Sequence, residues 1–235
     1  MCIRDRAVSA PQQPQAAAVL RRKAAELGAD LRWQPPLDRR RWPLGVPGAV
    51  QSANGAVALG MLRALAERGW PIDDDAIRHG FAAARWPGRL QQHRWQGIPL
   101  LLDGAHNAAA AEALRAELDA DPARYGLPPG PRRWVLGMLA TKQAPQILEA
   151  LLSPGDRAWI VPVGGHASCW TVPQLREALG AERQGWLGRQ LSAAADPAAA
   201  MRLAGAATNE AGGVTGPVIV AGSLYLIGQL LTPAP

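Results

Sequence analysis

The pattern that most limits the fold is the alternation of short apolar runs with helical segments after about residue 88. Runs of strand length, bounded by Gly and Pro, recur between segments with apolar residues at helical spacing. The expected strands are Arg89–Trp95, Ile98–Leu102, Trp134–Met138, Ala158–Val163, Gln184–Leu187 and Val218–Ala221. The expected helices are Asn107–Leu118, Ala144–Leu152, Val172–Leu179, Pro197–Ala206 and Ser223–Leu231. This alternation predicts an α/β fold in which helices cover a mostly parallel sheet.

The preceding part of the chain follows a different pattern. Its expected elements are strands at 7–10 and 29–33 and helices at 15–27, 50–68 and 73–84. The last two helices, joined by a short Gly-Trp-Pro turn, predict a helical hairpin. Trp86-Pro87-Gly88-Arg89 breaks the helical pattern, which predicts a domain boundary near Pro87 and domains at 7–87 and 88–235. Residues 1–6 (MCIRDR) show no pattern that leads into Ala7, and we expect them to be a non-native leader.

Composition and charge narrow the classes of partner. A chain of 235 residues with 48% hydrophobic and 19% charged residues can form a core and is not of disordered type. The net charge of +6 raises the question of nucleic acid, but the arginines are scattered and no basic face carries interleaved aromatics, so no nucleic-acid partner is expected. The apolar segment 218–231 is too short and too interrupted to span a bilayer, which predicts no membrane association. Two cysteines and the lack of a signal-peptide stretch favour a cytoplasmic protein.

Several common catalytic motifs are missing. The chain has no Gly-Lys pair and therefore no phosphate loop, no Gly-x-Gly-x-x-Gly after a strand, and no Gly-x-Ser-x-Gly. His166 and Cys169 are two possible metal ligands, but nothing supplies the other two, so they are interpreted as loop residues and no metal ligand is assigned.

Polar residues follow the buried run Ile98–Leu102. Asp103 lies where the strand ends, Gly104 permits a sharp turn, and Asn107 can cap the helix that follows. In open α/β sheets ligands bind at the carboxyl ends of strands, so Asp103 and His106 become candidate site residues. An equally weighted alternative is that Asp103 and Asn107 only close the turn.

Other polar residues follow neighbouring strands. Arg89 comes after Pro-Gly, Lys142 follows the strand that starts at Trp134, and Ser223 and Tyr225 follow Val218–Ala221. A guanidinium can bind phosphate oxygens in two-point fashion. If the sheet is parallel, these groups share one crevice. The alternative for Arg89 and Lys142 is solvated surface charge.

Four motifs together resemble the C-terminal part of folylpolyglutamate synthase/dihydrofolate synthase, the folate branch of the Mur ligase superfamily. They are Trp86-Pro-Gly-Arg89, Leu102-Asp-Gly-Ala-His-Asn107, Gly137-Met-Leu-Ala-Thr-Lys142 and Gly222-Ser-Leu-Tyr-Leu226. Val8-Ser-Ala-Pro-Gln12 and the helix with Gln51 and Asn54 also resemble this family, and the resemblance extends from Ala7 to the C-terminus in the family's order.

The resemblance implies a Rossmann-like C-terminal domain at 88–235, preceded at 7–87 by the end of a central ATP-binding domain. It also implies an ATP- and Mg²⁺-dependent ligase that adds L-glutamate to a pterin carboxylate, dihydropteroate or folyl-polyglutamate, through an acyl phosphate. The implied partners are small molecules, and the parent enzyme is expected to be monomeric.

Residue roles carry over from the same resemblance. Arg89 and His106 are the expected catalytic residues. The ATP-binding set is Asn54, Arg89, Asp103 and His106. Lys142 and Ser223 are expected to bind the carboxylates of the incoming glutamate.

The chain also departs from the family pattern. The family's phosphate loop and magnesium ligands lie upstream of its Ala-Pro-Gln segment, so we expect this chain to be a C-terminal portion that is inactive alone. Val50 precedes Gln51 where the family has His, Gly55 follows Asn54 instead of Ala, and Ala108 stands where Pro is common. Two alternatives stay open: a peptidoglycan-type Mur ligase, and a nucleotide- or amino-acid-binding module without catalysis.

Overall fold

The computed structural model describes residues 6–128, 130–206 and 216–232, and divides the chain into two compact units. The units comprise residues 1–86 and 87–235, and the division falls where Trp86-Pro87-Gly88 interrupts the helical pattern.

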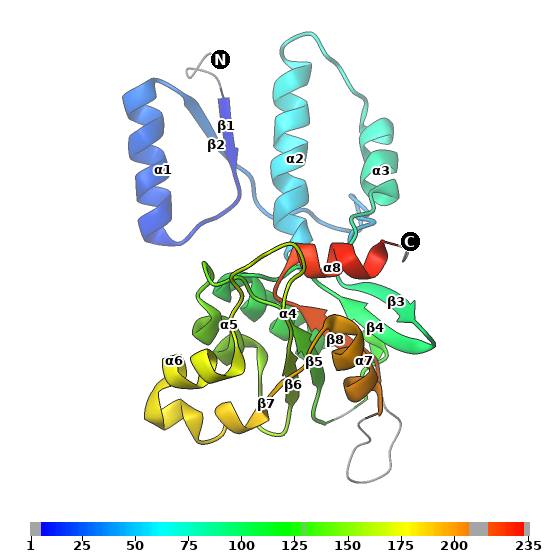
Figure 1. Ribbon diagram of the computed structural model, residues 1–235. Helices are drawn as coiled ribbons and strands as arrows, with labels where there is room; N and C mark the ends of the chain where they lie inside the picture. Colours follow the sequence, from blue (N-terminus) through cyan, green and yellow to red (C-terminus); the bar gives the residue numbers. More distant parts are fainter. Residues whose placement is uncertain (1–5, 129, 207–215, 233–235) are drawn as a thin grey trace. The chain divides into compact units, whose positions relative to one another are not determined.

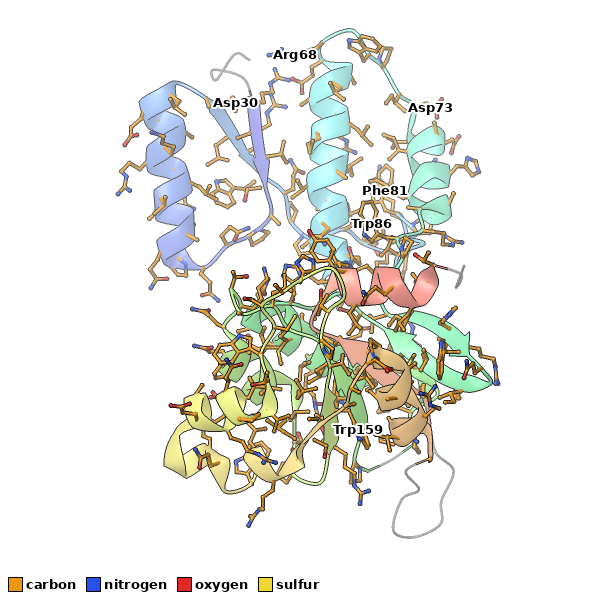
Figure 2. The ribbon with its side chains drawn as sticks, viewed as in Figure 1. Asp30, Arg68, Asp73, Phe81, Trp86 and Trp159 are labelled. Carbon is orange, nitrogen blue, oxygen red and sulfur yellow. The ribbon has the colours of Figure 1, made fainter. Side chains whose placement is uncertain are left out.

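The first unit combines a two-stranded parallel sheet with three helices (Figure 1). Its elements are β1 (Arg6–Ser9), α1 (Pro14–Leu27), β2 (Asp30–Trp33), α2 (Gln51–Ala66) and α3 (Asp74–Ala83). Asp73 caps α3 by accepting a hydrogen bond from the Ala76 N–H at 2.7 Å. Trp42, Leu59 and Ile77 form a small buried core, and Phe81, labelled with Asp73 in Figure 2, packs edge-on against Trp42.

Arg6 is part of this unit, whereas the sequence analysis groups it with the leader. It is the first residue of β1, pairs with Asp30 across the sheet, and its guanidinium forms an ion pair with Glu67. Residues 1–5 of the expected leader lie outside the described residues.

The second unit contains a six-stranded sheet with the strand order β3-β4-β8-β5-β6-β7. The strands are β3 (Gln91–Trp95), β4 (Ile98–Leu102), β5 (Arg133–Leu136), β6 (Arg157–Ile160), β7 (Leu191–Ala193) and β8 (Val218–Ala221). Every neighbouring pair is parallel except β3–β4, a hairpin closed by Gln96 and Gly97 with φ values of 46° and 82°. The mostly parallel α/β sheet is thus confirmed.

Helices cover both faces of the sheet (Figure 1). The helices α4 (Ala108–Ala120), α5 (Ala144–Leu151) and α6 (Val172–Gln184) pack on one face, and α7 (Pro197–Ala206) and α8 (Leu224–Leu231) on the other. Successive residues of β5 divide between the two cores, Trp134 and Leu136 on the α4 side and Val135 on the α7 side. The short 3₁₀ helices are η1 (Ala123–Tyr125) and η2 (Gly188–Gln190).

Two strand predictions need correction. The expected strand Gln184–Leu187 is wrong, because α6 continues through a kink at Gly180 (φ 69°) to Gln184, and Leu187 is buried in the helix-side core. The sixth strand is instead β7, whose three residues are too few to show alternation. The strand expected at Arg89–Trp95 begins two residues later in the structure, at Gln91. Leu90 has φ 45°, a value outside the range of a strand, so the chain bends before β3.

Within the described ranges, no helix combines the length and the hydropathy that crossing a membrane requires.

Candidate functional site

Three of the predicted site segments lie at one edge of the sheet in the second unit. Asp103 directly follows β4, Ser223 follows β8 after one glycine, and the loop with Lys142 follows β5. Since β8 pairs in parallel with both β4 and β5, the carboxyl ends of the three strands are neighbours. The fold therefore provides the shared edge that the sequence predicts, and ligands of such sheets bind at this edge.

The Asp103 carboxylate closes the turn after β4. Its side chain is buried, with Oδ2 accepting the Leu90 N–H at 3.0 Å and Oδ1 accepting the Ala105 N–H at 2.9 Å. The Gly104 N–H also donates to the Gly88 carbonyl at 2.7 Å. The turn-closing alternative thus describes what Asp103 does here, while its expected role in binding ATP stays a prediction.

Burial raises the pKa of Asp103 above its ordinary value. The backbone hydrogen bonds from Leu90 and Ala105 and the positive charge of Arg89 act in the opposite direction without cancelling it. The carboxyl group is therefore held in a place that disfavours its charge, which is frequent at functional sites.

Arg89 extends from a strained turn. Its neighbours Gly88 and Leu90 have φ values of 70° and 45°, and the Leu90 conformation is uncommon for a residue with a side chain. The Leu90 N–H is held by Asp103, so the same carboxylate fixes the backbone on the far side of Arg89. Among the described residues the Arg89 guanidinium has no hydrogen bond or ion pair. Its positive charge acts on the Asp103 carboxylate by electrostatic attraction.

Gly104 is needed for space and not for its φ. A Cβ atom there would lie 2.7 Å from Nη1 of Arg89 and 2.3 Å from Cδ2 of Leu224. Gly104 is not among the glycines with positive φ, so the interpretation that it permits a sharp turn is incomplete. Its missing side chain lets the arginine and the start of α8 approach the turn.

His106 and Asn107 complete this turn. His106 is half-buried, and its Nδ1 lies 2.8 Å from the Gly104 carbonyl. A carbonyl only accepts, so Nδ1 carries the proton in this bond and Nε2 of the neutral ring is an acceptor. Asn107 caps α4 by accepting from the Ala110 N–H at 2.9 Å, which confirms the predicted cap.

The Lys142 loop is fixed by the loop that follows β6. The Trp170 indole N–H donates to the Lys142 carbonyl at 2.9 Å, the Trp170 backbone N–H donates to Met138 at 2.9 Å, and the Ala140 N–H donates to Ser168 at 3.0 Å. The Lys142 ammonium makes no hydrogen bond or ion pair to any described residue. Its backbone is therefore anchored while its charge has no protein partner within that part of the chain.

Ser223 is the N-cap of α8. Its side-chain oxygen accepts from the N–H groups of Tyr225 at 3.2 Å and Leu226 at 3.5 Å, and the residue is 3% exposed. A glutamate contact would use the remaining hydroxyl proton, and that role stays a prediction.

Asn54 belongs to the first unit. It is exposed on α2, and its Nδ2 donates to Oε1 of Gln51 at 3.0 Å, which confirms that the two amides share one helix face. The other predicted site residues all lie in the second unit, and the expected role of Asn54 in binding ATP stays a prediction.

The sequence analysis missed His166 and Trp170 as parts of this edge. The His166 ring packs against the Tyr225 ring with centroids 4.4 Å apart and planes tilted by 57°. His166 and Trp170 both lie in the loop that follows β6. Their position after a parallel strand was the signal in the sequence that could have identified them.

The described residues do not bring three or more His, Cys, Asp or Glu side chains together in a way that could hold a metal ion. Arg89 and Lys142, two cations without a hydrogen-bond or ionic partner in that part of the chain, suit an anionic ligand at this edge.

Comparison with known proteins identifies relatives of the second unit. The family model for the dihydrofolate synthetase C-terminal domain matches residues 88–233. The Escherichia coli dihydrofolate synthase/folylpolyglutamate synthase is 36% identical over 131 residues, which are 56% of this chain and 29% of the relative.

Solved structures cover more of the chain. The Mycobacterium tuberculosis folylpolyglutamate synthase complexed with ADP has a TM-score of 0.75 and 26% identity, over 95% of this chain and 53% of that one. The Yersinia pestis bifunctional folylpolyglutamate synthase/dihydrofolate synthase, complexed with AMPPNP and Mn ion, has a TM-score of 0.68 and 29% identity, over 96% and 52%.

The chain thus spans about half the length of these solved relatives and a smaller share of the curated one. The family model covers more than half of the chain, and the parallel sheet agrees with that match. On these grounds the chain belongs to the dihydrofolate synthase/folylpolyglutamate synthase family.

Proposed function

We propose that this chain contributes the C-terminal domain of an ATP-dependent ligase that adds L-glutamate to a pterin carboxylate. The observation that carries the proposal is the pair of cations, Arg89 and Lys142, at the carboxyl edge of β4, β5 and β8. Neither side chain has a hydrogen-bonding or ionic partner among the described residues. The groups proposed to bind them, the phosphoryl group of ATP and a carboxylate of L-glutamate, are both anionic.

In the first proposed step the γ-phosphoryl group of ATP passes to the pterin carboxylate, giving an acyl phosphate and ADP. Arg89 neutralises the charge on the transferred group, since a guanidinium pairs with phosphate oxygens in two-point fashion. Asp103 acts as a positioning residue by holding the Leu90 N–H and the turn from which Arg89 extends. His106 lies on the same turn and offers Nε2 to the nucleotide.

In the second proposed step the amine of L-glutamate attacks the acyl phosphate, forming the amide and releasing phosphate. Lys142 binds a carboxylate of the incoming glutamate and holds its amine near the acyl carbon. Ser223 assists with its hydroxyl proton. Trp170 fixes the Lys142 backbone through the indole hydrogen bond and so limits where the ammonium can reach.

The first unit contributes to this proposal through Asn54, as a contact for adenine. The relatives complexed with ADP and AMPPNP support a nucleotide ligand, and the manganese of the Yersinia protein supports a divalent ion. We take the ion in cells to be Mg²⁺, bound by residues outside the set that the structure describes.

The test is ADP release by the protein, expressed from its complete natural reading frame, with dihydropteroate or folate and L-glutamate. Arg89→Gln should lower kcat by about a hundredfold, which is the scale of one lost transition-state donor. Lys142→Gln should raise the KM for glutamate with little change for ATP. Arg202→Gln, an exposed α7 residue with the same charge change, is the control.

Full activity of Arg89→Gln, or ADP release that is independent of the pterin and glutamate, would contradict the proposal. A folded protein that binds nucleotide but never turns over would favour the binding-module alternative.

A further inference from the structure

A polar pocket lies at the amino-terminal edge of the sheet in the second unit, opposite the edge with Asp103. It has a volume of about 560 Å³ and is open to solvent where β6 and β7 begin. That size is within the usual range of small-molecule sites. The lining residues are Pro154, Gly155, Asp156, Arg157, Trp159, Trp186, Arg189, Gln190 and Ser192. None of them belongs to the catalytic edge described above.

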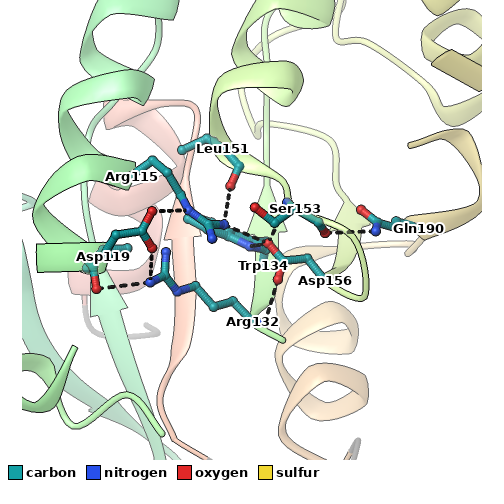
Figure 3. A network of polar contacts seen from close by, with 9 residues as sticks. Arg115, Asp119, Arg132, Trp134, Leu151, Ser153, Asp156 and Gln190 are labelled. Atoms are coloured by element: carbon teal, nitrogen blue, oxygen red, sulfur yellow. Dashed lines mark hydrogen bonds and ion pairs between the residues drawn. The ribbon is translucent and has the colours of Figure 1, made fainter. Parts of the chain in front are cut away.

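The walls of the pocket are fixed by hydrogen bonds. One wall is the turn before β6, where Asp156 accepts from the Ser153 N–H at 3.1 Å and from the Arg132 N–H at 2.7 Å (Figure 3). The other wall is η2, and its residue Gln190 donates from Nε2 to the Ser153 carbonyl at 2.9 Å. The two walls are therefore joined directly at Ser153, as Figure 3 shows.

Arg176 of α6 holds the second wall from behind. Its guanidinium donates to the Gly188 carbonyl at 3.1 Å and to the Leu191 carbonyl at 2.9 Å, one at each end of η2. A pocket whose walls are tied in this way loses little conformational freedom when it binds a ligand.

The charge of the pocket is positive. Arg157 and Arg189 are both exposed and line it, and Arg189 makes no hydrogen bond or ion pair among the described residues. Among the lining residues that the structure describes, the only acid is Asp156, whose side chain is 2% exposed and already paired with Arg115 at 3.1 Å. An anion that enters the pocket therefore meets the Arg189 guanidinium, and no described lining residue offers an unpaired carboxylate in competition.

The pocket also presents aromatic surface. Trp159, labelled in Figure 2, is 8% exposed, Trp186 is 37% exposed, and both line the pocket. Ser192 pairs with Trp159 across β6 and β7 and adds a hydroxyl beside the indole. Indole faces and guanidinium groups in one pocket suit a flat ring that carries a negative group.

We propose that this pocket is an accessory site for a planar aromatic anion, bound through Trp186 and Trp159 and through the guanidinium of Arg189. The anionic group is a carboxylate or a phosphate, since a guanidinium pairs with either. The site is independent of the ligase chemistry and stands whether or not the proposed function is correct.

The experiment follows indole N–H signals of the ¹⁵N-labelled 235-residue chain during titration with naphthoate, naphthyl phosphate and neutral naphthamide. Trp186→Leu assigns the Trp186 signal by its loss. We expect saturable movement of the Trp186 signal with at least one of the two anions and weaker binding of naphthamide. A preference between the anions identifies the charged group.

Arg189→Gln should weaken anion binding by roughly fivefold, about 1 kcal/mol, and should bring the anion close to naphthamide in affinity. The control Arg202→Gln, which changes charge by the same amount outside this pocket, should leave the affinity as it is. The proposal is overturned if the Trp186 signal stays still with both anions. It is equally overturned if naphthamide binds as tightly as they do, or if the two arginine variants behave alike.

Discussion

Two buried aspartates, at opposite edges of one sheet, are held in different ways. Asp156 at the amino-terminal edge accepts four hydrogen bonds, from the Arg132 and Ser153 N–H groups, the Trp134 indole and the Arg115 guanidinium (Figure 3). Asp103 at the carboxyl edge accepts two, both from backbone N–H groups. Its neighbouring arginine, Arg89, attracts it without a hydrogen bond.

The difference separates a structural carboxylate from one that serves a site. The guanidinium of Arg115 is paired with Asp156, and 21% of the Arg115 side chain is exposed. Its charge is therefore used within the protein. At Asp103 the carboxylate fixes backbone, and the arginine charge is left for a ligand.

Replacing Asp156 should destabilise the second unit most. Asp156→Ala leaves three N–H donors without their acceptor and removes one of the acceptors of Arg115, so the free energy of unfolding should fall by about 3 kcal/mol. Urea unfolding followed by circular dichroism measures it. Glu112→Ala, at an exposed position of α4, is the control and should stay within about 0.5 kcal/mol. Equal effects of the two variants would refute the structural assignment of Asp156.

Replacing Asp103 should cost less stability and more function. Asp103→Asn keeps the shape but offers one acceptor oxygen for two N–H donors, so about 2 kcal/mol of stability should be lost. The same variant should lower kcat for ADP release, because Leu90 and the Arg89 turn are no longer held. A variant with the full loss of stability and normal kcat would show that Asp103 is structural alone.

The contribution of Asp103 to the free energy of unfolding should decrease as pH rises. Its pKa is raised by burial in the folded protein, so the folded state retains the proton more firmly than the unfolded state. Stability from this group therefore falls as pH rises from about 4, the ordinary carboxyl pKa, to the higher folded value. The advantage of the wild type over Asp103→Asn should shrink across that window in urea unfolding. An advantage that grows with pH would contradict the sign.

Asp119 should show the opposite trend in the same experiment. Burial acts to raise its pKa, but Arg115 and Arg132 outweigh burial, and the pKa lies below its usual range. Its contribution is therefore present above about pH 4 and is lost as pH falls through the folded pKa. The pH profile of Asp119→Asn serves as the matched comparison for Asp103→Asn.

The smallest expected effect concerns Ser223. Ser223→Ala should cost about 1 kcal/mol by removing the cap of α8, whereas Ser223→Gly should cost only a few tenths. Thermal unfolding gives both values. If the hydroxyl also binds glutamate, the well-folded Gly variant should still raise the KM for glutamate. A normal KM in Ser223→Gly would limit Ser223 to capping.

Local rules predicted much of the carboxyl edge. Strand-ending polar residues and the Asn107 cap follow from patterns within a few residues, and the mostly parallel sheet follows from the alternation of strands and helices. The position of β8 between β4 and β5 was not predicted. The family resemblance added the roles of Arg89 and Lys142.

Long-range pairing was beyond the sequence. Asp156 occurs in a Pro-Gly-Asp turn, and nothing nearby shows that its partner Arg115 lies 41 residues away. The contact of His166 with Tyr225 joins the loop after β6 to the start of α8 in the same way. The edge strand β7 was not predicted because its three residues are too few to show alternation of apolar and polar side chains. The segment Gln184–Leu187 was predicted as a strand in its place.

The most direct test of the central claim is to map ligand contacts on the ¹⁵N-labelled protein with MgADP and L-glutamate. The account predicts that amide signals of Asp103–Asn107, the Lys142 loop and the start of α8 move together. Movement confined to the Asp156 edge, or none at the Asp103 turn at saturating ligand, would contradict it.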